Sequence, residues 1–211
     1  MQSERSNRPL SEVVPASRKI VYAFLTCAAL IGDLVSKSVA FHRLGLGGST
    51  EWLFDYSWVR FEFRTNLNQG ALWGMGQGFA PVFAGFSVLA VGGIIYWLFF
   101  RRAAASLWIT VTLALVSGGA LGNMYDRMGW HGVCFPNEDE PALAVRDFFH
   151  FQFGQPGGKL FLDWAIFNIA DVCLVTGAIM LVLHSFMTPA PEKTSEQSAP
   201  EPETVPGPKT V

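Results

Sequence analysis

Two aspartates are the residues of this sequence best suited to carry out chemistry. Asp171 lies at the start of a long apolar stretch, and Asn168 precedes it by three residues. Asp147 precedes a segment rich in phenylalanine. Every second residue from 149 to 153 is a phenylalanine, and these would share the side of Asp147 in an extended chain. A carboxylate held against phenylalanine rings loses hydration, so we expect the pKa of Asp147 to be raised.

If these two aspartates meet in the fold, they form an acid-base pair. Two close carboxylates in a poorly hydrated site cannot both ionise readily, so they share a proton. One can then activate water as a base, and the other can protonate a carbonyl as an acid. The pair would therefore permit hydrolysis of a peptide bond without a metal or a covalent intermediate.

Each aspartate also has an ordinary structural explanation. Asn168 is suited to cap a helix, with Asp171 in the first turn, where the helix dipole favours a negative charge. Asp147 could be a solvated loop charge, although its apolar neighbours argue against full solvation. Asp163 is a competitor for the second acid, but the sequence KLFLDW favours an interfacial turn, so we rank it lower.

Asp33 and Lys37 form a second candidate polar pair. They are four residues apart with the acid first, which is the spacing of an ion pair on one side of a helix. Lys37 could extend its ammonium toward the outer interface. We favour a structural role over catalysis for this pair.

The composition indicates a membrane protein with several spans. Of 211 residues, 50% are hydrophobic and only 15% are charged, whereas soluble domains are nearer 25% charged. Each of four apolar blocks has the roughly 20 residues that cross a bilayer as a helix. The blocks are residues 20–41, 79–100, 103 to about 124 and 164–187.

Four spans would put both termini on the same side of the membrane. The pair Arg101-Arg102 in a short turn favours the cytoplasm for that side. We therefore expect a cytoplasmic lead (1–18), a four-helix membrane domain (19–187) and a disordered cytoplasmic tail rich in Pro and Glu (188–211). Two loops (42–78 and 125–163) would face outward. Alternating apolar residues in both loops predict strands at the membrane interface.

The polar residues associated with the spans gather at one depth. Following each helix through the membrane places Asp33, Asn123, Asp147, Asn168 and Asp171 near the outer ends. The inner ends offer only arginine and lysine, as expected of plain anchors. Convergence on one side favours a site at the outer leaflet. A transporter would instead place polar groups near the midplane, and a non-enzymatic scaffold packed through small residues gives no reason to pair two aspartates.

Several other classes of function are disfavoured. A net charge of −2 gives no reason to expect nucleic-acid binding. The cysteines and histidines lack metal-ligand spacing, and the acidic sequence NEDE has no other ligand nearby, so we expect no metal. The chain contains no nucleophile elbow, HExxH motif, P-loop or GxGD sequence.

Five motifs in a fixed order carry a resemblance to a known family. They are DLVSK (33–37), NQGALWGM (68–75), GGALGNMYDR (118–127), VRDF (145–148) and FNIAD (167–171). With these motifs the chain resembles signal peptidase II, the lipoprotein signal peptidase of bacterial inner membranes. It departs from the family at Leu72, where a second alanine is usual, and in the longer segments 128–146 and 148–166.

The resemblance implies an α-helical polytopic membrane protein with four transmembrane helices and a small extracytoplasmic β-cradle. A helix or loop should close over the active site. The implied catalytic pair is Asp147 and Asp171. The residues that match those holding substrate or inhibitor are Asn68, Asn123, Arg127 and Asn168. The residues expected to support the site are Asp33, Lys37, Gly70, Gly119, Asp126 and Ala170.

The resemblance also implies the substrate and the location. The substrate would be a prolipoprotein whose cysteine carries diacylglyceryl, cut just before that cysteine. Membrane lipid and the cyclic peptide globomycin are the other expected partners, and no cofactor is implied. The active site would face the periplasm from the bacterial inner membrane.

Overall fold

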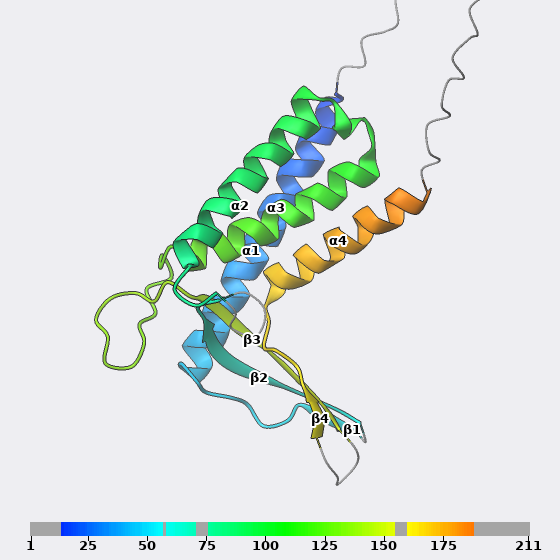
Figure 1. Cartoon of the computed structure of the whole chain (residues 1–211). Coiled ribbons are helices and arrows are strands. Elements are labelled where there is room, and N and C mark those ends of the chain that lie inside the picture. Colours follow the sequence, from blue (N-terminus) through cyan, green and yellow to red (C-terminus); the bar gives the residue numbers. More distant parts are fainter. Residues whose placement is uncertain (1–13, 57, 71–75, 155–159, 188–211) are drawn as a thin grey trace, which may run out of the picture.

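A computed structural model describes residues 14–56, 58–70, 76–154 and 160–187. Four long helices and a four-stranded antiparallel sheet make up the described chain (Figure 1). The helices are α1 (Ala16–Leu44), α2 (Ala80–Ile95), α3 (Leu107–Arg127) and α4 (Ile169–Met187). The strands are β1 (Phe54–Tyr56), β2 (Val59–Asn68), β3 (Val145–Gly154) and β4 (Leu160–Asp163).

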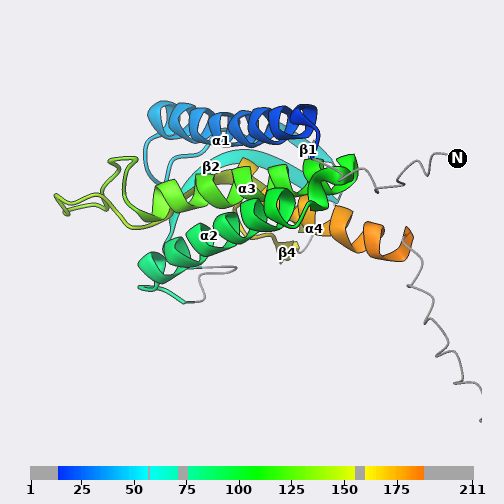
Figure 2. The ribbon, with the colours of Figure 1, turned by 90° about the horizontal axis from the view of Figure 1, so that it is seen from above.

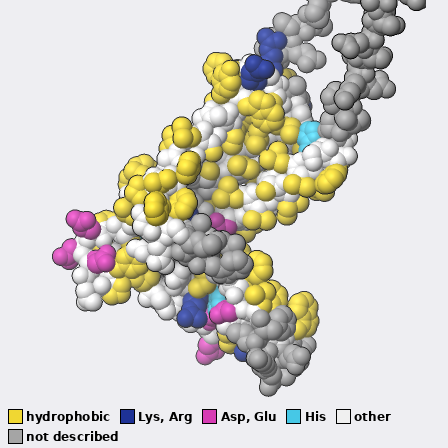
Figure 3. All heavy atoms as spheres, in the orientation of Figure 1, with side chains coloured by type: hydrophobic (Ala, Val, Ile, Leu, Met, Phe, Trp, Pro, Cys, Tyr) yellow, Lys and Arg dark blue, Asp and Glu magenta, His cyan; other side chains and the backbone are white. Residues whose placement is uncertain are grey.

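All four predicted spans are present as helices. Each is long and apolar enough to cross a membrane, and α2 continues through a π-helical turn (Tyr96–Phe100) to reach that length. A 3-10 turn (Ala103–Ala105) then leads into α3, whose first turn is capped by the Ser106 hydroxyl. In Figure 3 apolar side chains cover the helical part of the surface, as expected for a lipid-facing belt.

The helix boundaries differ from those of the apolar blocks at two points. Helix α1 begins at Ala16 and ends at Leu44, so it is longer at both ends than the predicted span. The fourth apolar block begins near position 164, but helix α4 begins at Ile169, directly after the predicted cap Asn168. The preceding residues are extended, because Trp164 and Phe167 donate backbone hydrogen bonds to Phe151 and Phe149 of β3. The predicted tail (188–211) and most of the predicted lead lie outside the described residues.

Helix α3 is the central helix of the bundle. It packs against the other three long helices, and Figure 2 shows it between α1 and α2. Small residues permit this close packing, as the sequence predicted. A Cβ added at Gly118 would lie 2.6 Å from Ala29 of α1, and one added at Gly119 would lie 2.5 Å from the carbonyl oxygen of Ala170 of α4.

The sheet has strand order β1-β2-β3-β4 and lies at one end of the helices (Figure 1). Alternation in β2 and β3 gives the sheet one aromatic face, as predicted. Phe61 of β2 contacts Phe149 and Phe151 of β3, with ring centroids 6.1 and 4.7 Å apart. A bulge between Phe63 and Asn66 interrupts the β2–β3 register just before the strand reaches the helices.

The opposite face of the sheet carries a polar cluster in which Glu62 and His150 are buried and Asp163 is exposed. His150 bonds through Nδ1 to Glu62 at 2.8 Å and through Nε2 to Asp163 at 2.7 Å. These contacts join β2, β3 and β4 across the sheet. Asp163 therefore ends a strand rather than forming the interfacial turn that we predicted. Because it pairs with His150 on this face, it does not join Asp147.

The sheet and the described chain ends lie at opposite ends of the helix bundle. In Figure 1 the start of α1 and the end of α4 both lie away from the sheet, apart from each other. The loop between α3 and β3 projects from the sheet end, and its acidic residues Glu138, Asp139 and Glu140 are exposed.

The close contact at Gly119 can be tested by adding a side chain. Val at position 119 would collide with the backbone of α4, so we expect Gly119→Val to lower the unfolding free energy by about 1–3 kcal/mol. Gly93→Val in α2 is a matched control, since a Cβ there meets nothing within 4 Å. Thermal unfolding in detergent would measure both. Equal melting temperatures for the two variants would contradict tight α3–α4 packing.

Candidate active site

The start of α4 is fixed by a reciprocal capping arrangement. The Asn168 side-chain oxygen accepts the backbone N–H of Asp171 at 3.0 Å, and Asp171 Oδ2 accepts the backbone N–H of Asn168 at 3.1 Å. This is the geometry of a capping box, and it confirms the predicted cap. It leaves Asp171 Oδ1 free to make a contact outside its own helix.

Strand β3 brings Asp147 to the same place. The backbone N–H groups of Phe148 and Phe149 donate to the carbonyl oxygen of Phe167, at 3.0 and 2.8 Å. Phe167 directly precedes Asn168, so this pairing places the start of α4 beside the start of β3. Asp147 and Asp171 are thus held near each other by backbone pairing between elements distant in sequence.

Three asparagine amides connect the two carboxylates. Asn168 Nδ2 donates to Asp147 Oδ1 at 2.6 Å and to Asn123 Oδ1 at 3.2 Å. Asn123 Nδ2 then donates to Asp171 Oδ1 at 2.8 Å. On the other side, Asn68 Nδ2 donates to Asp147 Oδ2 at 3.2 Å. Every carboxylate oxygen of the pair therefore accepts at least one N–H donor, which holds both side chains in one orientation.

The two aspartates differ in their exposure. Asp147 is 1% exposed, whereas Asp171 is half-buried. Burial disfavours the charged form, and the nearby Asp171 carboxylate repels a second negative charge. Together these effects raise the pKa of Asp147 from 3.8 to about 8, and the hydrogen bonds from Asn168 and Asn68 only partly oppose them.

A buried network of charges lies directly behind the asparagines. Lys37 Nζ is 2.7 Å from Asp33 and 3.2 Å from Asp126. Arg146 donates to Asp126 from Nε and Nη2, at 3.1 and 2.9 Å, and its backbone N–H donates to Asp126 Oδ2 at 2.9 Å. Two acids and two bases make this group electrically neutral, as a buried charge cluster requires.

This charge network corrects the predicted orientation of Lys37 and includes one residue that the sequence analysis did not single out. Lys37 pairs with Asp33 as predicted, but it is fully buried and does not extend toward the outer interface. Instead it donates to Asn123 Oδ1 at 3.0 Å. Arg146 was not singled out from the sequence. Its place directly before Asp147, within an otherwise apolar motif, was the available signal.

The remaining predicted residues lie around this centre. Arg127 Nη2 donates to the Gly70 carbonyl at 3.3 Å, and the guanidinium lies over the Phe83 ring. The Gly70 N–H donates to Asn68 Oδ1 at 3.0 Å. Ala170 donates its backbone N–H to Asp33 at 2.8 Å, which ties α4 to α1. Part of the NQGALWGM motif (71–75) lies outside the described residues.

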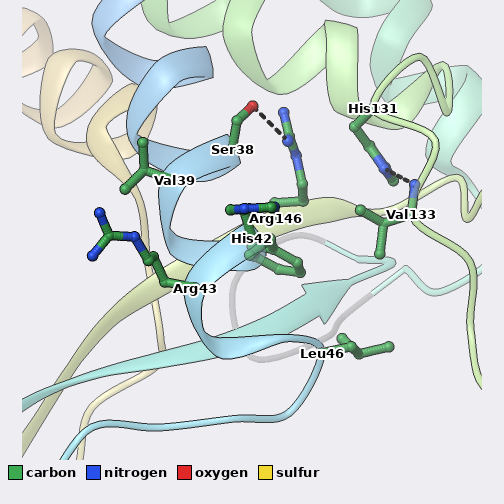
Figure 4. Close-up of a pocket in the computed structure, with 9 residues that line it drawn as sticks. Ser38, Val39, His42, Arg43, Leu46, His131, Val133 and Arg146 are labelled. Atoms are coloured by element: carbon green, nitrogen blue, oxygen red, sulfur yellow. Dashed lines mark hydrogen bonds between the residues drawn. The ribbon is translucent and has the colours of Figure 1, made fainter.

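Two cavities border the site from different sides. The larger lies on the α1 side of Arg146, away from the aspartates, and Figure 4 shows the Arg146 guanidinium extending toward Ser38 there. A smaller cavity opens beside Asn68, whose amide belongs to the network. It is lined by Asn66, Leu67, Asn68, Gln69, Gln77, Phe135, Ala165 and Ile166.

Comparison with known proteins yields one family. The family model for signal peptidase (SPase) II matches residues 25–187. A lipoprotein signal peptidase of Rhodopirellula baltica is 41% identical over 176 residues, covering 82% of this chain and 74% of that protein. One from Geobacillus thermodenitrificans is 32% identical over 180 residues, covering 85% and 98%.

A solved structure shows the same fold. It is a bacterial membrane enzyme determined by the in meso method at 2.3 Å resolution, which this chain matches with a TM-score of 0.60 and 24% identity. The match covers 90% of this chain and 96% of that one. With the family model spanning all four helices and the sheet, the chain belongs to the signal peptidase II family.

Proposed function

We propose that this chain is an aspartic endopeptidase that removes the signal peptide from diacylglyceryl-modified prolipoproteins. The cut would fall just before the lipid-bearing cysteine. Its relatives from R. baltica and G. thermodenitrificans carry the name lipoprotein signal peptidase. The observation that carries the proposal is that Asp147 and Asp171, from β3 and α4, are bound by the same chain of asparagine amides.

The environments of the two aspartates support different roles in catalysis. Asp147 is the more buried of the two and has the raised pKa, so it holds the shared proton and acts as the acid. Asp171 lies in the first turn of α4, where the helix dipole favours a negative charge, and accepts two N–H donors. Asp171 is therefore the base.

Hydrolysis then proceeds in two steps with the atoms balanced. Asp171 takes a proton from water while the water oxygen bonds to the scissile carbonyl carbon, and Asp147 gives its proton to the carbonyl oxygen. The resulting gem-diol collapses as Asp171 returns its proton to the leaving nitrogen and the C–N bond breaks. Asp147 recovers its proton from a gem-diol hydroxyl, so both groups end as they began.

Other residues would hold the substrate backbone. Arg127 Nε is buried and makes no hydrogen bond to the described residues, so it can donate to a substrate carbonyl. Asn68 lines the cavity that borders the amide network and already contacts Asp147. The acyl chains of the substrate would remain in the lipid beside the apolar helices, with the scissile bond at the depth where α4 begins.

The dyad can be tested by isosteric substitution. We expect Asp147→Asn and Asp171→Asn each to lower cleavage of a diacylglyceryl-modified prolipoprotein by about 100- to 10,000-fold, because acid and base each contribute roughly that factor. Both variants should still insert in the membrane. Asp163→Asn is the matched control: it changes an aspartate on the opposite face of the sheet and should retain cleavage. Activity of either dyad variant close to that of this control would overturn the dyad assignment.

The proton on Asp147 predicts a pH dependence of stability. The folded state holds this proton up to about pH 8, whereas the unfolded state releases it near 3.8. The resulting stability is fully present below 3.8 and is lost as the pH rises through 8, by at most about 1.4 kcal/mol per pH unit. Asp147→Asn removes this group.

Melting temperatures measured from pH 5 to pH 9 provide the test. The wild type should lose stability relative to Asp147→Asn as the pH rises, because only the wild type releases this proton on unfolding, and that release becomes more favourable at higher pH. Curves that stay parallel across this range would show that Asp147 is already ionised in the folded protein.

A further inference from the structure

We propose that Lys37 is a positioning residue for the dyad: its ammonium fixes the Asn123 amide so that the NH₂ group faces Asp171. Lys37 lies on α1 and touches neither aspartate of the dyad in the described contacts. The hydrogen-bonded route from Lys37 to Asp171 passes through one side chain of α3, Asn123. The inference rests on the proposed peptidase activity and names how the base of that reaction is held.

The donors and acceptors around Lys37 allow only one orientation of the Asn123 amide. An ammonium has three protons to donate and accepts none. Lys37 Nζ lies near three acceptors, Asp33 Oδ2 at 2.7 Å, Asn123 Oδ1 at 3.0 Å and Asp126 Oδ2 at 3.2 Å. The amide oxygen of Asn123 must therefore face Lys37, which turns Nδ2 toward Asp171 Oδ1 at 2.8 Å.

The opposite orientation of the Asn123 amide would make two unfavourable contacts. It would direct the Asn123 oxygen at the Asp171 carboxylate and the NH₂ group at the ammonium. Asn168 favours the observed orientation too, since its Nδ2 donates to Asn123 Oδ1 at 3.2 Å. Asn168 is, however, a neutral donor, and its Nδ2 also donates to Asp147. The charged donor at Lys37 supplies the stronger preference.

Stability alone is a weak reason for a fully buried lysine. Removing a buried ion pair in favour of apolar residues is often neutral or stabilising, because desolvation offsets the attraction. Asp33 has a separate structural contact, since its Oδ1 accepts the Ala170 N–H at the start of α4. An asparagine at position 33 would keep that acceptor. The contact of Lys37 with Asn123 is the one that reaches the proposed catalytic residues.

A pair of variants in a common background isolates this contact. In Asp33→Asn protein, Lys37→Gln and Lys37→Met both remove the charge and have similar volume. Only glutamine can still donate an N–H to Asn123. We expect both to melt within a few degrees of each other. Lys37→Met should have a kcat at least about 10-fold below that of Lys37→Gln, with KM unchanged, because misplacing a reacting group costs up to about 100-fold.

The assay uses purified full-length protein in detergent with a diacylglyceryl-modified prolipoprotein, and the wild type is measured alongside. Equal kcat for the two Lys37 variants would overturn the positioning role, and so would loss of folded protein in both, which would make Lys37 structural. Adding Asn123→Ala should abolish the difference between them, and its persistence would also count against the proposal. Absence of cleavage by the wild type would instead refute the proposed peptidase function.

Discussion

An ionised group in apolar surroundings is costly unless partners surround it, and this constraint governs the end of the helix bundle that meets the sheet. Asp33, Lys37, Asp126 and Arg146 are at most 4% exposed, and they balance to zero net charge. Their contacts join α1, α3 and β3 in one cluster. Asp147 and Asp171 have no cation in their described hydrogen bonds and rely on neutral asparagine amides. Paired charges therefore support the site, whereas the two aspartates proposed as the dyad are held by neutral amides.

Asparagine is suited to this position because each amide has a donor end and an acceptor end. Asn123 accepts from Lys37 and donates to Asp171, while Asn168 caps its own helix and donates to Asp147. An aspartate at either position would lack the donor and add a charge. The orientation of the dyad is thus specified by polar groups that cannot themselves take up its proton near neutral pH.

Much of this could be predicted from the sequence, because the relevant signals are local. Apolar blocks of about 20 residues mark the four helices, alternation marks β2 and β3, and the spacing of Asp33 and Lys37 marks their ion pair. The fourth apolar block extends upstream of α4 because hydropathy does not distinguish an apolar helix from the extended chain that pairs with β3; the capping signal at Asn168 marks the helix start correctly. The partners of Lys37 and Arg146 depend on long-range packing, which residue spacing along one element does not encode.

The sheet has two open edges, β1 and β4, whose backbone groups have no further strand to pair with among the described residues. Such edges cannot enter hydrocarbon without leaving N–H and C=O groups unsatisfied. The aromatic face favours lipid, while the edges and the Glu62–His150–Asp163 cluster require water. These opposed preferences confine the sheet to a narrow range of depths at the boundary between lipid and water. Asp147 belongs to β3 of this sheet. The depth of its carboxyl relative to the acyl chains therefore depends on the solvation of the sheet edges rather than on the length of any helix.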